Sequence, residues 1–157
     1  MSSDDVYLGN PNLKKANTQI EFTADQISEF IKCKKNPVYF AKKYVQIVNL
    51  DEGLVPFAPY KFQEKLIKRF HKERFNICKM PRQTGKSTTV VAYLLHYAVF
   101  NDSVNIGILA NKAATARELL GRLQTAYENL PRWMQQGIVA WNKGSLELEN
   151  GSKILAA

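Results

Sequence analysis

Residues 80–88 read Met-Pro-Arg-Gln-Thr-Gly-Lys-Ser-Thr and give the clearest indication of the fold. Residues 75–80 predict a short strand, and the residues after the loop predict a helix that extends to about Phe100. A loop between a strand and a helix that ends in Gly85-Lys86-Ser87 is the context that a phosphate-binding Walker A loop requires. Main-chain N–H groups and the helix dipole both favour an anion at such a place. The stretch therefore predicts a phosphate-binding loop.

The loop departs from the generic motif at its first position. The pattern GxxxxGK[ST] has a glycine where this chain has Met80. If the loop binds a nucleotide, Lys86 can reach the β- and γ-phosphates and Ser87 can coordinate Mg²⁺. The competing interpretation is an ordinary turn, in which Lys86 is a solvated residue at the start of a helix.

Strands and helices alternate around the loop, which is typical of α/β architecture. A helix is expected over residues 60–72, a second buried strand over 105–110 and an amphipathic helix over 113–130. The C-terminal residues 138–148 predict a β-hairpin region, and Asn150-Gly151 predicts a type I′ turn. We therefore expect residues 56–157 to form one α/β domain.

The N-terminal third has a different character. Residues 1–18 are polar and lack periodicity, so we expect a flexible, weakly ordered arm. Residues 19–55 predict a small helical preface, in which Thr23 caps one helix and Pro37 begins a second. Ile27, Phe30 and Ile31 are expected to form the buried stripe of the first helix.

Composition narrows the function classes. The 157 residues suit one globular domain, and no apolar run approaches the about 20 residues that a membrane-spanning helix needs. The sequence also starts without a signal-peptide pattern, which favours an intracellular protein. Cys33 and Cys78 lack metal-ligand spacing and are interpreted as packing residues. The net charge of +8 is compatible with a polyanionic partner or with a solvated basic surface.

Two further residues are candidates for nucleotide chemistry. Arg82 lies inside the loop, where a guanidinium can stabilise the charge that develops on the γ-phosphate during phosphoryl transfer. Its competing interpretation is a surface salt bridge. Gln63 precedes the loop on the expected helix, where its amide could bond an adenine edge with donor and acceptor together. By itself, a glutamine on a helix is usually solvent-facing.

Four segments together resemble the large terminase subunit of contractile-tailed bacteriophages. They are Tyr60-Lys61-Phe62-Gln63, the loop at residues 81–88, Ile106-Gly107-Ile108-Leu109-Ala110-Asn111-Lys112, and residues 137–145. The resemblance covers nearly all of the chain from about Tyr7. In that family the first Walker glycine is replaced and an arginine stands in the loop, so Met80 and Arg82 fit the family pattern.

The resemblance implies a partial RecA-like P-loop NTPase sheet of the additional-strand type. It also implies an ATPase with ATP and Mg²⁺ as cofactors, which drives double-stranded DNA into a procapsid. The portal protein and the small terminase subunit are the implied partners, and the host cytoplasm, at the procapsid portal, is the implied location. Arg82 and Lys86 become the catalytic candidates and Ser87 the magnesium ligand. The implied ATP-binding residues are Gln63, Arg82, Gln83, Thr84, Gly85, Lys86, Ser87 and Thr88.

One part of the family pattern is missing from residues 88–157. No apolar strand there ends in the Asp-Glu pair of Walker B, which holds magnesium and activates water, and no nuclease domain is recognised. Asp102 follows a helix, and Glu147 and Glu149 lie on a polar hairpin face. We therefore expect partial phosphate binding and negligible turnover from these residues alone. The sequence is expected to be either a truncated piece of a longer chain or a separately encoded N-terminal piece that a C-terminal chain completes. The alternatives are another helicase-like P-loop ATPase and a non-catalytic nucleotide- or DNA-binding module.

Overall fold

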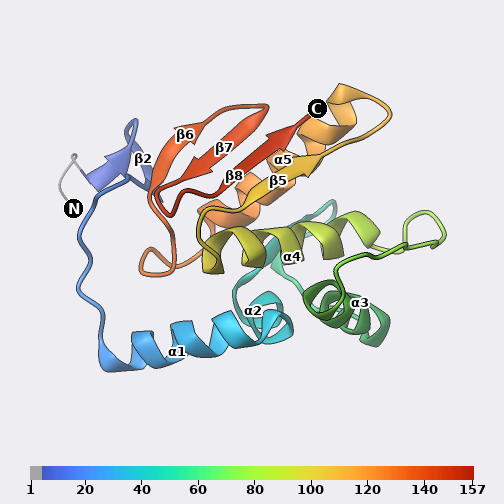
Figure 1. The fold of residues 1–157 in the computed structure, drawn as a ribbon, viewed down its shortest axis with the longest axis horizontal. Helices are drawn as coiled ribbons and strands as arrows, with labels where there is room; N and C mark the ends of the chain where they lie inside the picture. Colours follow the sequence, from blue (N-terminus) through green and yellow to red (C-terminus); the bar gives the residue numbers. More distant parts are fainter. Residues whose placement is uncertain (1–4) are drawn as a thin grey trace.

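A computed structural model describes residues 5–157 (Figure 1). Five helices and eight strands are assigned, which confirms the predicted α/β class. The helices are α1 (Ala24–Lys35), α2 (Pro37–Tyr44), α3 (Lys61–Lys72), α4 (Lys86–Phe100) and α5 (Ala113–Glu128). The strands are β1 (Val6–Tyr7), β2 (Asn10–Lys14), β3 (Gln46–Asn49), β4 (Gly53–Pro56), β5 (Asn105–Ile108), β6 (Ile138–Trp141), β7 (Ser145–Leu148) and β8 (Lys153–Ala156). None of the described helices is long and apolar enough to cross a membrane.

The main sheet has the strand order β5-β8-β7-β6. Strand β5 pairs in parallel with β8, whereas β7 pairs antiparallel with both of its neighbours. Helix α5 connects β5 to the hairpin and packs against β8, and α4 lies beside α5 below the sheet (Figure 1). The buried core lies between these elements and includes Leu120, Leu123, Leu148 and Ile154. The hairpin that the sequence predicts over residues 138–148 is therefore confirmed, as part of this sheet.

The turn at residues 150–151 holds the end of α4. The Asn150 amide nitrogen donates to the carbonyls of Ala98 and Asn101, at 2.9 and 3.1 Å, so it satisfies acceptors that the helix leaves open. Gly151 has a φ of 81°. The predicted type I′ turn is wrong, because it needs a positive φ at both central residues and Asn150 has none.

Residues 1–18 were predicted as a flexible arm, but their described part forms a packed hairpin. Residues 1–4 of that prediction lie outside the described residues. Strands β1 and β2 pair, and Leu13 is buried. The main-chain N–H of Lys14 donates to the Gln135 side chain at 3.0 Å, and its ammonium lies 3.1 Å from the Glu149 carboxylate. The sequence did not predict this packing, because Gln135 and Glu149 lie more than 100 residues from Lys14 in the chain.

The helical preface forms largely as predicted. Thr23 caps α1 through a capping box with Gln26, and α2 begins at Pro37. Strands β3 and β4 add a hairpin to this region. The predicted stripe is only partly right, because Phe30 packs against the core while Ile27 and Ile31 are about half exposed, at 50% and 47%.

The predicted strand over residues 75–80 is absent. These residues form no regular element, and Phe75 and Ile77 are exposed. A strand exists only where a neighbour supplies hydrogen bonds, and no residue in the range 5–157 pairs with this segment. Cys78 is also exposed, so the prediction that it is a packing residue is wrong. Cys33 is buried, as predicted.

His96 is a buried polar residue in the interior of α4. Its Nε2 lies 2.9 Å from the carbonyl oxygen of Cys33, and its ring packs against Phe40 and Phe100. Its Nδ1 has no hydrogen-bond partner among the described residues. Burial lowers the pKa of His96 to about 4.

Lowering the pH from about 7.5 to about 5 is expected to reduce the free energy of unfolding by about 2 kcal/mol through His96. Because the folded pKa is lowered from 6.5, the unfolded chain binds the proton more tightly. Stability is therefore complete above pH 6.5 and falls as the pH approaches 4. Carboxylates with a lowered pKa, such as Glu29, change the free energy of unfolding only below about pH 4.5. Urea unfolding along this pH series measures the effect, and an unchanged slope in His96→Phe would contradict it.

Candidate functional site

The candidate site is the loop that leads into α4. Gly85 is the N-cap of α4 and has a φ of 73°, in the left-handed region that favours glycine. Gln83 also has a positive φ, of 58°. This backbone reverses the chain sharply before Lys86, where α4 begins. The helix therefore begins at Lys86, inside the stretch predicted as loop, and the strand before the loop is not formed.

The side chain of Lys86 folds back over the loop. Its ammonium donates to the carbonyl oxygen of Met80 at 2.6 Å. The Thr84 hydroxyl makes a second closure, because it donates to the carbonyl oxygen of Pro81 at 3.0 Å. The two bonds curl residues 80–86 into a compact turn. Lysine has three donors, so the bond to Met80 leaves two for a ligand.

The first turn of α4 offers donors to an anion. The main-chain N–H groups of Lys86, Ser87 and Thr88 have no hydrogen-bond partner in the described residues, as expected at a helix start. Thr89 begins the helical ladder, since its N–H and its hydroxyl both donate to the carbonyl of Gly85, at 3.0 and 2.8 Å. This donor set, with one lysine beside it, suits a phosphate group.

Gln63 connects α3 to this loop. Its amide oxygen accepts from the main-chain N–H of Tyr60 at 2.8 Å, and its amide nitrogen donates to the carbonyl of Gly85 at 3.3 Å. The side chain is buried, with 4% exposed. The amide oxygen keeps a second lone pair and the amide nitrogen a second N–H, so the adenine contact expected of Gln63 stays a prediction.

Gly85 is required by its surroundings as well as by its φ. A Cβ atom built on Gly85 would overlap the amide nitrogen of Gln63. Gln63 is buried, so it cannot move aside without losing its own bonds. A side chain at position 85 therefore does not fit beside Gln63 in this arrangement.

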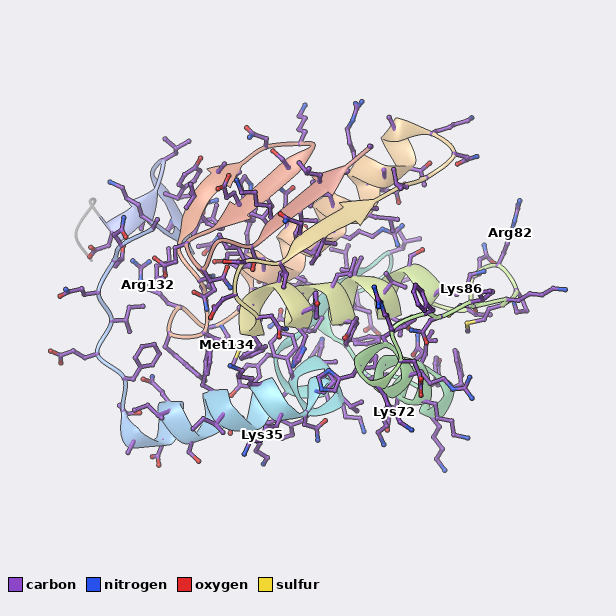
Figure 2. All side chains as sticks on the ribbon, viewed as in Figure 1. Lys35, Lys72, Arg82, Lys86, Arg132 and Met134 are labelled. Atoms are coloured by element: carbon purple, nitrogen blue, oxygen red, sulfur yellow. The ribbon has the colours of Figure 1, made fainter. Side chains whose placement is uncertain are left out.

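Arg82 lies apart from the other candidates. Figure 2 shows its side chain at the tip of the loop, extending away from Lys86. The residue is exposed, as are Gln83 and Ser87, whereas Thr84 and Thr88 are half-buried. The structure thus brings together Gln63, Gly85 and Lys86, but not Arg82.

A comparison with protein families matches residues 77–157 to the model described as "Terminase large subunit, T4likevirus-type, N-terminal". The match begins in the segment before the loop and covers more than half of the chain. The chain belongs to the T4-like terminase large subunits. Membership supports a role in bacteriophage DNA packaging.

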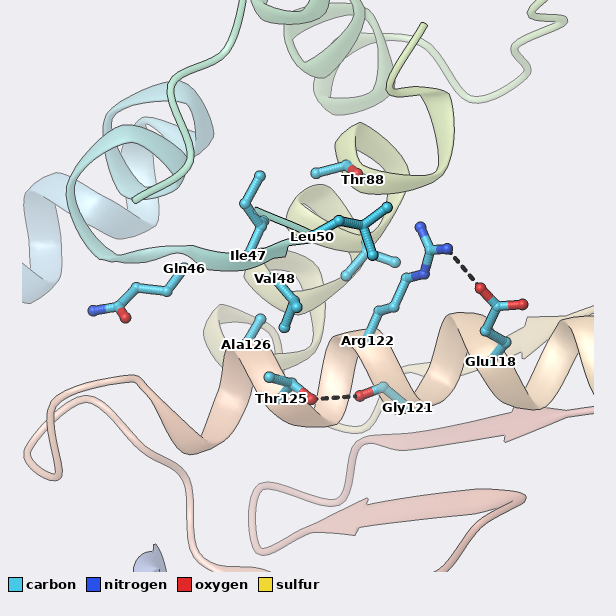
Figure 3. A pocket seen from close by; sticks show the side chains of 11 residues that line it. Gln46, Ile47, Val48, Leu50, Thr88, Glu118, Gly121, Arg122, Thr125 and Ala126 are labelled. Atoms are coloured by element: carbon cyan, nitrogen blue, oxygen red, sulfur yellow. Dashed lines mark hydrogen bonds and ion pairs between the residues drawn. The ribbon is translucent and has the colours of Figure 1, made fainter. Parts of the chain in front are cut away.

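Two hollows flank the loop helix of this terminase. The smaller, of about 150 Å³, has Lys86 and Ser87 at one end and apolar side chains from α4, β5 and α5 elsewhere, including Ile108 and Leu119. The larger, of about 700 Å³, lies between β3, α4 and α5. Thr88 lines the larger hollow, as do Arg122 and Glu118, which lie one turn apart on α5 and form an ion pair at 2.5 Å (Figure 3). Sequence patterns signalled neither hollow, because both depend on how the helices pack.

Six acidic residues of the terminase lie in ion pairs with lysine or arginine. No group of three or more His, Cys, Asp or Glu side chains that could hold a metal ion occurs within residues 5–157. Glu64 on α3 lies 2.7 Å from the Lys42 ammonium, and the hydrogen bond from Lys42 lowers the pKa of Glu64. Ser87, which the sequence predicts as a magnesium ligand, lies in the first turn of α4 with no carboxylate cluster described around it.

Proposed function

We propose that residues 80–88 bind the triphosphate of ATP, and that this chain contributes the nucleotide-binding part of a DNA-packaging motor. The observation that carries the proposal is the Lys86 ammonium held 2.6 Å from the Met80 carbonyl, beside the three free N–H groups of the first turn of α4. A ligand-free P-loop lysine needs a local acceptor, and a phosphate oxygen is a stronger acceptor than a carbonyl. The same lysine can therefore exchange Met80 for a phosphate.

The other loop residues have defined parts in this proposal. Ser87 supplies a hydroxyl to the magnesium ion, which bridges and neutralises the phosphate oxygens when it is bound. Thr84 holds the loop closed through Pro81, and Gln83 contributes its left-handed backbone. Arg82 acts as an arginine finger only after its side chain turns toward the phosphates. Thr88 supplies a main-chain N–H.

The fold that we propose is a RecA-like P-loop sheet of the additional-strand type. Its support is an apolar segment, residues 75–80, that leads into the loop but lacks a strand neighbour, together with an outer edge of β5 that pairs with no described residue. We propose that further strands, which also bring the acidic residues, lie between them. The implied partners are double-stranded DNA, the portal protein and the small terminase subunit. The proposed location is the procapsid portal in the host cytoplasm.

Replacing Lys86 with alanine is expected to weaken Mg²⁺–ATP binding by roughly 10- to 100-fold, since charge-assisted hydrogen bonds to phosphate are lost. Titration calorimetry with ATP and magnesium measures the effect. Lys79→Ala is the matched control, because Lys79 is exposed just before the loop. Equal affinities in Lys86→Ala and the unchanged protein would contradict the proposal.

A non-catalytic DNA-binding module is the second candidate. It is favoured by the exposed basic residues of α3, which are Lys61, Lys65, Lys68, Arg69 and Lys72. Such a module would bind DNA with a steep dependence on salt and would give no heat with ATP.

A further inference from the structure

We infer that four lysine side chains along one face of α3 form a contact surface for the phosphate backbone of duplex DNA. These residues, the lysine row, are Lys61, Lys65, Lys68 and Lys72. The inference deepens the proposed function, on which it rests, because it assigns the surface through which the motor would hold its DNA. It concerns DNA alone, so it can be tested without a nucleotide.

The lysine row lies on the solvent side of α3. Its members follow one another at spacings of four, three and four residues, which places them on one stripe of a helix. All four are exposed, whereas Gln63 and Ile67, the buried residues of the helix, lie on the opposite face. Figure 1 shows α3 on the side of α4 that faces away from the main sheet. The row is therefore accessible to a large partner.

The charge of the row is largely uncompensated. Three of its lysines take part in no ion pair described within residues 5–157, and the fourth, Lys72, lies 3.8 Å from Glu73 at the end of the helix. Glu64, the one acidic residue within α3, is paired with Lys42 of α2 at 2.7 Å. Like charges one turn apart repel one another, so a polyanion that lies along the row relieves this repulsion.

The length of the row suits a phosphate backbone. Lys61 and Lys72 are eleven positions apart, so the row extends over about 16 Å of helix. Duplex DNA carries one negative charge per about 1.7 Å of its axis, so several phosphates of each strand lie along that length. Lysine side chains are long and flexible, and each ammonium can therefore reach a phosphate without a change in the helix.

The composition of α3 favours a phosphate backbone over a protein surface or a particular base sequence. Protein–protein interfaces are depleted in lysine, whereas phosphate groups are bound chiefly by lysine and arginine. Arg69 is exposed beside the row and adds a further cation. The one amide side chain of the helix, Gln63, is buried, so we expect binding that does not depend on sequence. The row itself contains none of the aromatic side chains on which single-strand binders stack bases.

Two triple variants with the same change of net charge test the inference. The first removes three charges of the row: Lys61→Gln, Lys65→Gln and Lys68→Gln. The matched control removes three charges from exposed lysines outside α3 that are in no described ion pair: Lys34→Gln, Lys35→Gln and Lys143→Gln. Glutamine and lysine have similar helix propensities, so both variants should keep the melting temperature of the unchanged protein. Fluorescence anisotropy with two labelled duplexes of unrelated sequence, and with a single strand of equal length, is measured over a series of salt concentrations.

We expect the unchanged protein to bind the two duplexes equally, and more tightly than the single strand. In the row variant, the slope of log affinity against log salt should become shallower by about two to three, because each lost phosphate contact removes about 0.9. Lys65→Gln alone should reduce the slope by about one, and the control triple should leave it unchanged. An equal loss of slope in the control would show a general effect of net charge and overturn the inference. Absence of duplex binding at low salt, a preference for one duplex, or equally tight binding of the single strand would also overturn it.

Calorimetry with magnesium and ATP separates this inference from the proposed function. The row variant should keep the ATP affinity of the unchanged protein, and Lys86→Ala should keep the salt slope for duplex DNA. If the unchanged protein binds ATP but no duplex, the inference alone fails. If it binds the duplex through the row but gives no heat with ATP, the proposed nucleotide site fails and the contact surface on α3 stands.

Discussion

Replacing Gly85 with alanine is expected to lower the free energy of unfolding by about 2–3 kcal/mol and to abolish triphosphate binding. Alanine is sterically strained at a φ of 73°, and its Cβ would overlap the Gln63 amide. Relief requires either a change of backbone at the N-cap of α4 or movement of a buried side chain. Both displace the N–H groups that the phosphate would use.

Gly121→Ala is the control for this substitution. Gly121 lies within α5, and a Cβ built there meets nothing within 4 Å. Alanine should therefore stabilise that helix, by up to about 1 kcal/mol. Urea unfolding and calorimetry of the two variants test the contrast. If Gly85→Ala keeps the stability and the ATP affinity of the unchanged protein, the loop does not have the geometry described above.

The chain is also expected to bind Mg²⁺–ATP without steady hydrolysis. Phosphoryl transfer to water needs a residue that orients or deprotonates the water, and a positioned base contributes about 10²- to 10⁴-fold to the rate. No Walker B pair is recognised within residues 88–157, and the loop candidates Lys86, Ser87 and Arg82 carry no carboxylate. Turnover should therefore stay at least about 10²-fold below that of a completed site.

A phosphate-release assay with excess ATP measures this turnover. Adding a C-terminal chain that carries an apolar strand ending in Asp-Glu should restore it, and Lys86→Ala should then remove it again. Steady hydrolysis by the 157 residues alone, lost in Lys86→Ala, would contradict the account. No gain from the added chain would count against completion by a second polypeptide.

The sequence predicted local structure well where the signal was local. The N-cap at Thr23 and the start of α2 at Pro37 both depend on residues within a few positions. The strand at residues 75–80 failed for the opposite reason, because a strand is defined by a neighbour and not by its own apolar residues. The packed N-terminal hairpin was missed for the same reason.

The site was predicted as a set of residues but not as a geometry. Spacing identified Gly85 and Lys86, and the structure places them together at the start of α4. Spacing could not show that the amide of Gln63 is engaged by Tyr60 and Gly85, because a hydrogen bond across 22 residues leaves no periodic trace. The outward direction of Arg82 likewise depends on a loop conformation that the sequence alone does not give (Figure 2).

A crystal structure with magnesium and a non-hydrolysable ATP analogue tests the central claim most directly. We predict the triphosphate inside the turn of residues 80–88, with the Lys86 ammonium moved from the Met80 carbonyl to a phosphate oxygen. We also predict that Gln63 keeps its bonds to Tyr60 and Gly85. An analogue bound elsewhere, with Lys86 still on Met80, would contradict the account.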